Sequence, residues 1–294
     1  MPLLSIIVPV YNAEHWVGRL LQSLNSMSQE SKQSSELVIV DDGSRDGSMN
    51  VVESKRNELL PLNSVVLRQD NQGTAGARNT ALRYCGGEWV FFLDADDELV
   101  FDPVPHIKQS PNSSALGFSV KFYKNLKYWG LLRPVLLTLE NHLDILTARN
   151  PFASSSIIFK KDRIRSFFDP DLYAMEDWLF WVMNPLIFQT MKIFPKETSA
   201  IVHSHGTNKS SNYIKNGECR RSVAHRILVN LGYKLTEKQK NNLLIQSQIG
   251  LIQQEEKIAL NTLLRLPCNV VLYAKLILFL FLRGHFSKID FYGR

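Results

Sequence analysis

Three carboxylates follow an apolar segment of the chain, and their spacing suits the binding of a cation. Asp94, Asp96 and Asp97 come directly after Trp89–Leu93, a run typical of a buried strand. Two carboxylates at positions i and i+2 can both approach one hard divalent cation, Mn²⁺ or Mg²⁺, which keeps room for substrate phosphates. Three carboxylates without a cation would repel one another. A helix-capping turn is the structural alternative, but the position at a strand end favours the metal site.

A glycine-rich segment offers a second kind of chemistry. Gly73–Arg78 lacks the GK[ST] of a P-loop, and no GxGxxG follows the first apolar run, which argues against a dinucleotide-binding domain. One interpretation is a closely packed helix N-terminus. The other is a set of backbone N–H groups, with Arg78, lying near a phosphate.

The elements that must position these residues alternate along the first hundred residues. Strands are predicted at Leu4–Pro9, Glu36–Val40, Ser64–Arg68 and Trp89–Leu93. Helices are predicted from Val17, from near Ser48 and at Thr74–Tyr84. This alternation indicates βαβ units and a mainly parallel sheet. Right-handed crossovers bring the carboxyl ends of the strands to one edge, where open α/β sheets bind ligands. That edge would carry Pro9–Asn12, Asp41–Ser44 and Asp94–Asp96.

Composition narrows the class of protein. The chain has 294 residues, 45% hydrophobic and 21% charged, which argues against disorder and allows a real core. Its three cysteines lack metal-ligand spacing, so neither a disulfide framework nor a structural zinc site is expected, and a reducing compartment is favoured. No basic residue precedes the first apolar run, which is therefore predicted to be a strand and not a signal peptide.

Charge is distributed unevenly. Residues 1–100 hold 8 Lys/Arg and 14 Asp/Glu, a net of −6, whereas residues 101–215 hold 14 and 9, a net of +5. Residues 216–294 hold 12 and 5, a net of +7. The acidic residues 1–100 favour cations or polar small molecules as ligands, and the basic residues 101–294 favour binding to an anionic surface. The alternative is that these charges only keep the protein soluble. No nucleic-acid motif accompanies the basic region, so nucleic acid is not expected as a partner.

Four blocks in order resemble the family 2 glycosyltransferases, which have the GT-A fold. The blocks are Ser5–Asn12, Val38–Ser44, Asn71–Asn79 and Phe91–Asp97. The resemblance covers about residues 1–100 and implies a nucleotide-diphosphate-sugar donor, a divalent metal and inversion at the anomeric carbon. It implies donor-binding positions at Pro9, Tyr11, Glu14, Asp41, Arg78 and Asp94. Asp94 and Asp96 match the family's DxD pair, with Asp96 as the expected direct metal ligand.

Two later segments extend the resemblance. Met175–Trp178 matches the family's ED motif, which implies Asp177 as the general base, with Glu176 as the second candidate. The structural alternative is an acidic helix start, and the two interpretations are compatible. The segment from His203 to Ser211 resembles a basic-x-His-x-x-Ser pattern, which implies His205 as a third metal ligand. His203 departs from that pattern, because many relatives carry Arg there.

The rest of the chain is predicted to serve the acceptor and the membrane. Lys121–Trp129 interleaves cations with aromatic rings, which favours either an anionic acceptor or membrane headgroups, or else a solvated strand pair. Residues 267–282 are strongly apolar, but Lys275 interrupts them and fewer than about 20 apolar residues do not span a bilayer. A helix lying in the membrane interface is expected, with packing on the protein's own core or on a partner as the alternative.

These observations predict an α/β protein with a GT-A, Rossmann-like, mainly parallel sheet flanked by helices and a C-terminal helical extension. Residues 1–100 would form the nucleotide-sugar-binding half, 101–215 the acceptor-binding half and 216–294 a membrane-associating extension. The expected activity is inverting transfer of a sugar to a hydroxyl of a glycan or lipid-linked acceptor in cell-surface polysaccharide assembly. The expected location is cytoplasmic, peripheral on the inner face of the cell membrane. The alternatives are a non-catalytic nucleotide-sugar-binding or scaffolding subunit and a sugar-phosphate nucleotidyltransferase.

Overall fold

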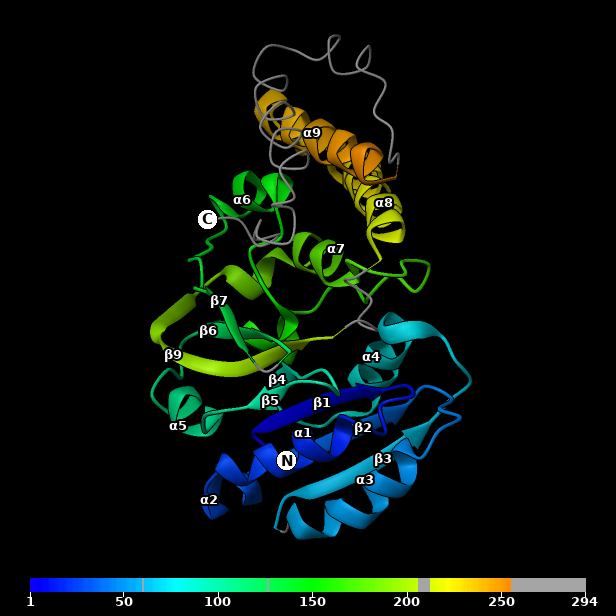
Figure 1. The fold of residues 1–294 in the computed structure, drawn as a ribbon. Helices are drawn as coiled ribbons and strands as arrows, with labels where there is room; N and C mark the ends of the chain where they lie inside the picture. Colours follow the sequence, from blue (N-terminus) through cyan, green and yellow to red (C-terminus); the bar gives the residue numbers. More distant parts are fainter. Residues whose placement is uncertain (60, 126, 206–211, 255–294) are drawn as a thin grey trace.

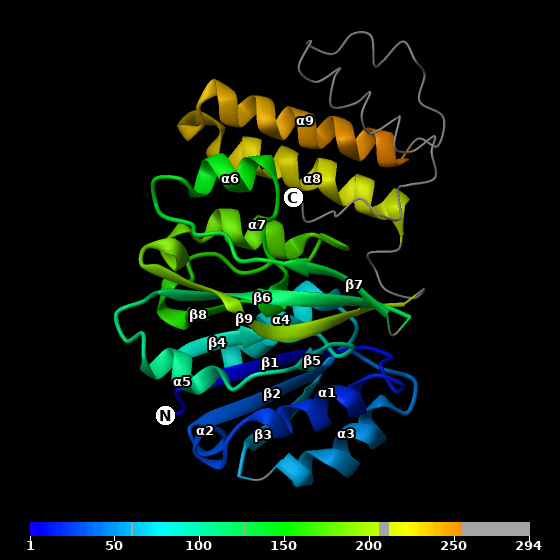
Figure 2. The same ribbon diagram turned by 60° about the vertical axis from the view of Figure 1, so that its left-hand side comes forward.

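The computed structural model describes residues 1–59, 61–125, 127–205 and 212–254. Within these ranges, a mixed sheet lies between two layers of helices, and the helices α8 and α9 stack beyond one of the layers (Figures 1 and 2). The strands are β1 Leu4–Val10, β2 Ser35–Asp41, β3 Asn63–Arg68, β4 Trp89–Phe92, β5 Glu98–Leu99, β6 Ala115–Lys124, β7 Lys127–Leu132, β8 Ile157–Lys160 and β9 Met191–Ser204. The helices are α1 Val17–Ser23, α2 Gln29–Gln33, α3 Ser48–Arg56, α4 Gly73–Tyr84, α5 Pro103–Lys108, α6 His142–Ala148, α7 Glu176–Met183, α8 Tyr213–Leu231 and α9 Glu237–Gln254.

The sheet joins a parallel half to a mixed half. In the described residues the strand order is β3-β2-β1-β4-β8-β6-β9-β5, with β7 also paired to β6. Strands β3, β2, β1 and β4 are parallel, as the sequence predicts, and their bounds differ from the predicted ones by one residue at most. Strand β8 then runs antiparallel to β4 and to β6. The later strands therefore extend the first half directly, without a separate sheet.

Alternating residues of each parallel strand pack into two different cores. On β1, Ile7 faces one core, whereas Ile6 and Val8 face the other. On β4, Val90 and Phe92 face the first core, and Trp89 and Phe91 the second. The first core lies under α4, α6, α7 and α8, and the second under α1, α3 and α5. Burial on both faces explains why these strands are nearly continuous apolar runs.

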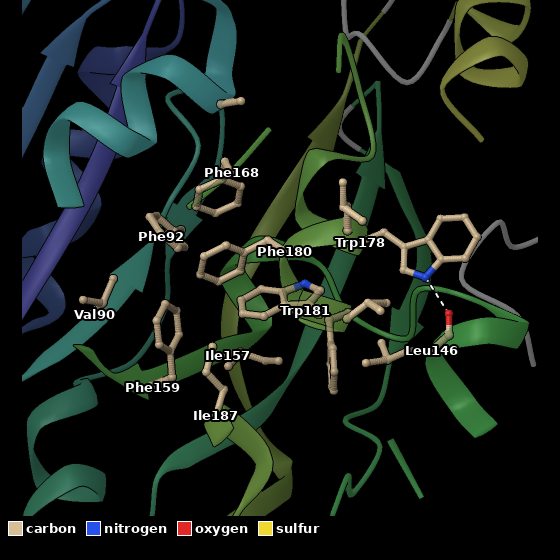
Figure 3. Packing of buried hydrophobic residues seen from close by; sticks show 14 of the residues in the cluster. Val90, Phe92, Leu146, Ile157, Phe159, Phe168, Trp178, Phe180, Trp181 and Ile187 are labelled. Carbon is tan, nitrogen blue, oxygen red and sulfur yellow. Dashed lines mark hydrogen bonds between the residues drawn. The ribbon is translucent and has the colours of Figure 1, made fainter. Parts of the chain in front are cut away.

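Aromatic rings join the two halves of the sheet to α7. Phe92 of β4 lies 5.3 Å from Phe168, and Phe168 stacks on Phe180 of α7 at 4.1 Å between ring centroids (Figure 3). Trp181 packs edge-on to Phe159 of β8, and the indole of Trp178 donates to the Leu146 carbonyl at 2.7 Å (Figure 3). Burial of such rings fixes the start of α7 against the end of β4.

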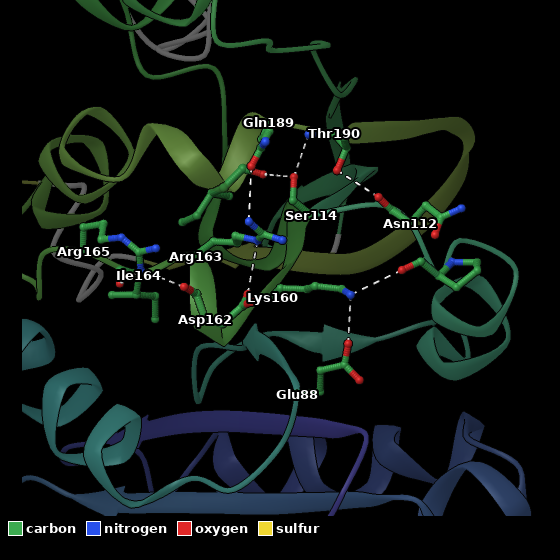
Figure 4. Close-up of polar contacts among 12 residues, drawn as sticks. Glu88, Asn112, Ser114, Lys160, Asp162, Arg163, Ile164, Arg165, Gln189 and Thr190 are labelled. Carbon is green, nitrogen blue, oxygen red and sulfur yellow. Dashed lines mark hydrogen bonds and ion pairs between the residues drawn. The ribbon is translucent and has the colours of Figure 1, made fainter.

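Polar contacts hold β8 in its place between β4 and β6. Lys160 at the end of β8 forms an ion pair with Glu88 at 2.9 Å and donates to the carbonyl of Pro111 (Figure 4). Ser114 accepts from the backbone of Thr190 and donates to the carbonyl of Ile187 (Figure 4). The segments before β6 and β9 are thereby tied to each other.

The chain after residue 211 is helical where it is described, as the sequence predicts. Helices α8 and α9 pack on each other, and α9 also contacts α6, where Gln239 donates to Asp144 at 2.7 Å. The apolar segment 267–282, predicted to contact the membrane, lies outside the described residues. Among the described residues, no helix is both long enough and apolar enough to cross a bilayer.

Candidate active site

The predicted ligand-binding edge forms where β1, β2 and β4 end. Parallel pairing of β1 with β2 and with β4 brings the turns that follow these strands side by side. The turn after β1 contains Tyr11 and Asn12, and the Tyr11 ring is 50% exposed. An exposed flat ring at this edge can stack on a nucleobase. Pro9 lies within β1 itself, paired with Val40.

The turns after β1 and β2 are bound to each other by side chains. The backbone N–H of Asn12 donates to Ser44 at 3.1 Å, and the Asn12 side chain accepts from the N–H of Arg45 at 2.9 Å. Glu14 accepts from the N–H of Gly47 at 3.0 Å. A Cβ at position 47 would lie 2.5 Å from that carboxylate, so a larger residue there would displace the Glu14 side chain. In this structure Glu14 shapes the turn on which a donor would rest.

Asp41 and Asp42 are both buried and hold the second turn. Asp41 accepts from the N–H of Ser44 at 2.9 Å and lies 3.2 Å from the Arg68 guanidinium. Asp42 accepts from the side chain of Gln69 and the N–H of Gln72. The turn adopts a left-handed backbone at Gly43, where φ is +78°. Direct contact of Asp41 with a ribose remains a prediction.

Arg78 connects the carboxylates of two distant motifs. It lies in α4, is 2% exposed, and donates to Asp94 and to Glu176, each at 2.7 Å. Its guanidinium also lies over the rings of Phe92 and Phe168. Burial alone would lower the pKa of Arg78, but the carboxylates of Asp94, Glu176 and Asp177 raise it above the ordinary value. The arginine is a fixed cation between the two acidic segments.

The ED segment begins α7 at an unusual backbone position. Met175 precedes the helix with φ of +61°, a left-handed conformation that reverses the chain immediately before Glu176. Asp177 accepts from Asn150 at 3.0 Å and from its neighbour's N–H at 2.8 Å. Burial and the nearby Glu176 carboxylate raise the pKa of Asp177 to about 7, against the opposing effect of Arg78. A carboxylate with such a pKa is suited to accept a proton near neutral pH.

The predicted metal ligands Asp96 and His205 are in contact. The His205 ring lies 3.0 Å from the Asp96 carboxylate and stacks on Trp16 at 4.3 Å between centroids. Arg19 donates to the backbone carbonyl of Asp96 at 2.8 Å. Asp94, the other member of the DxD pair, is 40% exposed at its side chain and contacts Arg78. In the described part of the chain, no group of three or more His, Cys, Asp or Glu side chains is gathered closely enough to hold a metal.

The donor atoms nevertheless fit a divalent cation. The carboxylate of Asp96 and the imidazole of His205, which lie next to each other in space, suit Mn²⁺, because this cation accepts both ligand types. Burial, with Asp96 and Asp94 as neighbours, raises the pKa of the Asp97 carboxyl well above its usual range. Burial is the larger cause of this shift, and the crowding of negative charge adds to it; a bound cation would relieve the crowding.

Some contributing residues gave no signal in the sequence. Asn150, Trp16 and Arg19 contact predicted site residues, but each lies 27 to 189 positions away from its contact in the chain. No local motif marks them. The resemblance implies a donor contact for Arg78, which remains a prediction, and the structure shows this arginine paired with Asp94 and Glu176.

Sequence similarity identifies the family of this chain. Residues 5–165 match the family described as "Glycosyl transferase family 2". The chain belongs to glycosyl transferase family 2. It is therefore a nucleotide-sugar-dependent glycosyltransferase, and the family and activity class expected from the four sequence blocks are confirmed.

Individual relatives of this glycosyltransferase agree with that assignment. An uncharacterised glycosyltransferase of Haemophilus influenzae is 29% identical over 224 residues, covering 73% of this chain and 84% of that protein. The poly(ribitol-phosphate) beta-N-acetylglucosaminyltransferase TarS of Staphylococcus aureus is 41% identical over 93 residues, covering 32% of this chain and 16% of TarS. That second match spans only a small part of the relative's length.

Solved structures show the same fold for this glycosyltransferase. TarS 1–349 in complex with UDP-GlcNAc matches with a TM-score of 0.61 at 24% identity, covering 92% of this chain and 79% of that one. The mannosyltransferase PcManGT of Pyrobaculum calidifontis, in complex with GDP-Man and Mn²⁺, matches with a TM-score of 0.61 at 17% identity, covering 97% and 82%. The expected GT-A α/β fold with its C-terminal helices is confirmed.

Proposed function

We propose that this glycosyltransferase inverts the anomeric centre of its donor and transfers a sugar to a hydroxyl of a cell-surface glycan or its lipid-linked precursor. One observation carries the proposal: Arg78 holds the DxD carboxylate Asp94 and the ED carboxylate Glu176 at 2.7 Å each. The expected metal-binding and base-bearing segments therefore share one location.

Asp177 would act as the general base. In an inverting transfer the acceptor oxygen attacks the anomeric carbon from the face opposite the nucleoside diphosphate, and its proton must be removed. The new C–O bond forms as the bond to the diphosphate oxygen breaks, and that oxygen takes the electron pair. The pKa of about 7 keeps part of Asp177 deprotonated at neutral pH, and Asn150 orients one of its oxygens. Asp177 would receive the proton.

Asp94, Asp96 and His205 would hold a divalent cation, Mn²⁺ or Mg²⁺. Such a cation supplies positive charge against the departing diphosphate. The Mn²⁺ in the PcManGT structure supports this assignment, because that protein shares the fold. Tyr11 at the exposed edge of the site would stack on the donor base, and the turn held by Glu14 and Asp41 would position the ribose.

The names of two relatives and the charge of the C-terminal residues support the proposed acceptor and location. TarS acts on poly(ribitol-phosphate), and another relative is named for transfer to a diphosphoundecaprenol-linked sugar. A lipid-linked or polymeric acceptor in surface glycan assembly is consistent with both names. The net charge of +7 over residues 216–294 supports peripheral contact with the anionic inner face of the cell membrane.

A donor panel tests the proposal. Nucleotide sugars with uracil, guanine or thymine as the base are each incubated with the full chain. Each mixture contains Mn²⁺, Mg²⁺ or EDTA. Thermal shift measures binding, and release of nucleoside diphosphate measures transfer to water or to added acceptor. We expect one base to raise the unfolding temperature only with metal, and diphosphate to be released. Binding without any release would favour the non-catalytic subunit, and pyrophosphate consumption would favour the nucleotidyltransferase.

A further inference from the structure

The β6–β7 hairpin forms a basic, aromatic surface that the proposed mechanism does not use. The chain contains no Asp or Glu between Asp102 and Glu140, and the cations in this interval are Lys108, Lys121, Lys124, Lys127 and Arg133. The last four belong to the hairpin or directly follow it, and all four are exposed. Within the described residues none of these four pairs with a carboxylate. They form an unneutralised cationic surface, here called the hairpin surface.

Exposed rings lie among these cations. Tyr128 is 58% exposed and Trp129 is 38% exposed. Tyr128 meets Tyr123 edge-on at 5.9 Å, and Trp129 meets Phe122 edge-on at 6.3 Å, so both rings are supported from the neighbouring strand. A supported, exposed ring offers a flat face to the carbon-bearing side of a sugar, at little cost in conformational entropy.

The hairpin surface borders the candidate active site. Strand β9 is parallel to β6, with Tyr123 paired to His203 and Lys124 to Ser204. The Tyr123 ring lies 6.1 Å from that of His203. His205, which contacts Asp96, follows Ser204 directly. The hairpin and the end of β9 run side by side (Figures 1 and 2).

We infer that the hairpin surface binds an anionic acceptor chain, a glycan or polyol polymer linked by phosphodiesters, and directs its end to the site. The inference rests on the proposed function, because it names the acceptor class for that same reaction. Exposed lysines and exposed rings occur together on the hairpin, and such a polymer presents phosphates together with sugars or polyols. A surface that continues into the site fits a chain whose terminal hydroxyl reacts there. Membrane binding would require the hairpin surface to lie flat on lipid headgroups. It would not explain why the hairpin is paired with β9, the strand that leads to His205.

The test measures binding directly and does not depend on turnover. The full chain is titrated against a fluorescent ribitol-phosphate oligomer, a neutral dextran oligomer of similar length, and vesicles of phosphatidylcholine with about one third phosphatidylglycerol. The variant carries Lys121→Glu, Lys124→Glu and Lys127→Glu together. Lys196→Glu is the matched control, because Lys196 is an exposed lysine on β9 eight positions before Ser204. Unfolding temperatures establish that each variant is folded.

We expect the triple variant to bind the phosphate oligomer about 10–100-fold more weakly, since each exposed ion pair is worth up to roughly fivefold in affinity. The affinity of the triple variant for the oligomer should also depend less on salt concentration than that of the unaltered chain. Lys196→Glu should bind like the unaltered chain. Tyr128→Ala should weaken oligomer binding several-fold without changing the salt dependence.

Three results would overturn the inference. One is wild-type affinity of the triple variant for the oligomer. Another is loss of vesicle binding alone, which would make the hairpin surface a membrane contact. The third is equal binding of the neutral and phosphate oligomers. Because donor turnover is not measured, failure of the glycosyl-transfer proposal would appear in the donor panel and not in this titration.

Discussion

At the scale of single residues, Asp177 and its neighbour Glu176 have different surroundings. Glu176 pairs with Arg78, whereas the donors to Asp177 among the described residues are the neutral side chain of Asn150 and a backbone N–H of its own helix. The charge of Arg78 is thus neutralised mainly by the other carboxylates, and burial dominates at Asp177. Two adjacent acids therefore acquire different proton affinities.

The first prediction concerns the rate of transfer. Asp177→Asn should keep donor binding but lower the transfer rate by about 10²–10⁴-fold, the usual worth of a general base. Wild-type rate should fall as pH drops below about 7, because the base becomes protonated. Initial rates from pH 5 to 9 measure both effects, with Asp70→Asn, an exposed acid, as control. If Asp177→Asn transfers sugar as fast as the wild type, the general base is Glu176 or another group.

The second prediction concerns stability. The folded-state pKa of Asp177, about 7, is above its unfolded value, so the folded protein holds this proton more tightly than the unfolded chain does. Stability is therefore lost as pH rises from about 4 through about 7. Asp177→Asn should raise the free energy of unfolding at pH 8 by about 1–3 kcal/mol and change it little at pH 4. Urea denaturation at both pH values measures it, and an equal effect at both would contradict the shifted pKa.

The third prediction concerns the metal. Asp96→Asn should weaken Mn²⁺-dependent donor binding about 10-fold or more, because it removes an anionic ligand. His205→Ala should weaken metal affinity in the same direction. Donor titration with and without EDTA measures the effect, and Asp162→Asn, an exposed acid remote from the DxD pair in sequence, is the control. Equal donor affinity in the wild type with and without EDTA would remove the metal from the proposal.

At the scale of secondary-structure elements, Arg78 joins α4, the end of β4 and the start of α7. The three elements meet at one guanidinium, with Asp94 40% exposed and Glu176 only 10% exposed at their side chains. Loss of the arginine would leave Asp94 able to regain water, whereas Glu176 would stay buried without its partner. The energetic effect should therefore arise mainly at α7.

The fourth prediction follows from this asymmetry. Arg78→Met should lower the free energy of unfolding by about 3–5 kcal/mol, the usual cost of breaking a buried ion pair from one side. Adding Glu176→Gln should recover much of that loss, because the buried Glu176 carboxylate that lost its partner is removed as well. Arg163→Met, which breaks an exposed pair with Asp162, should cost less than about 1 kcal/mol. No recovery in the double variant would show that packing of Arg78 against its rings matters more than its charge.

Elements and site differ in how far the sequence predicts them. The strands of the first hundred residues were predictable because burial on both faces leaves a run of apolar residues, as in Ile6–Val8. The pair Asp94 and Asp96 was predictable because it follows such a run. The contact of Asn150 with Asp177 was not, because it depends on how α6 leads into β8 and on the turn at Met175. Those are tertiary features without a local periodicity.

At the scale of the whole molecule, the fifth prediction concerns the C-terminal segment. Residues 265–294 are expected to dock the enzyme on anionic membrane, with each basic group near the surface worth about 1 kcal/mol. The full chain should co-sediment with phosphatidylglycerol-containing liposomes and be partly released by high salt. The chain without 265–294 should remain in the supernatant and still bind donor, because the donor motifs precede residue 100. If both forms stay in the supernatant and the shortened one is misfolded, the segment belongs to the core.

The Arg78 bridge also constrains how such enzymes can diversify by recombination. The match to TarS spans 93 residues, 32% of this chain, so a relative can share one part of the chain without the rest. A chimera that joins one parent's first hundred residues to another parent's remainder inherits Arg78 from the first and the position of Glu176 from the second. A hybrid that inherits only one member of this buried pair would carry an unpaired charge, whereas a hybrid with both members, or with neither, would avoid that cost.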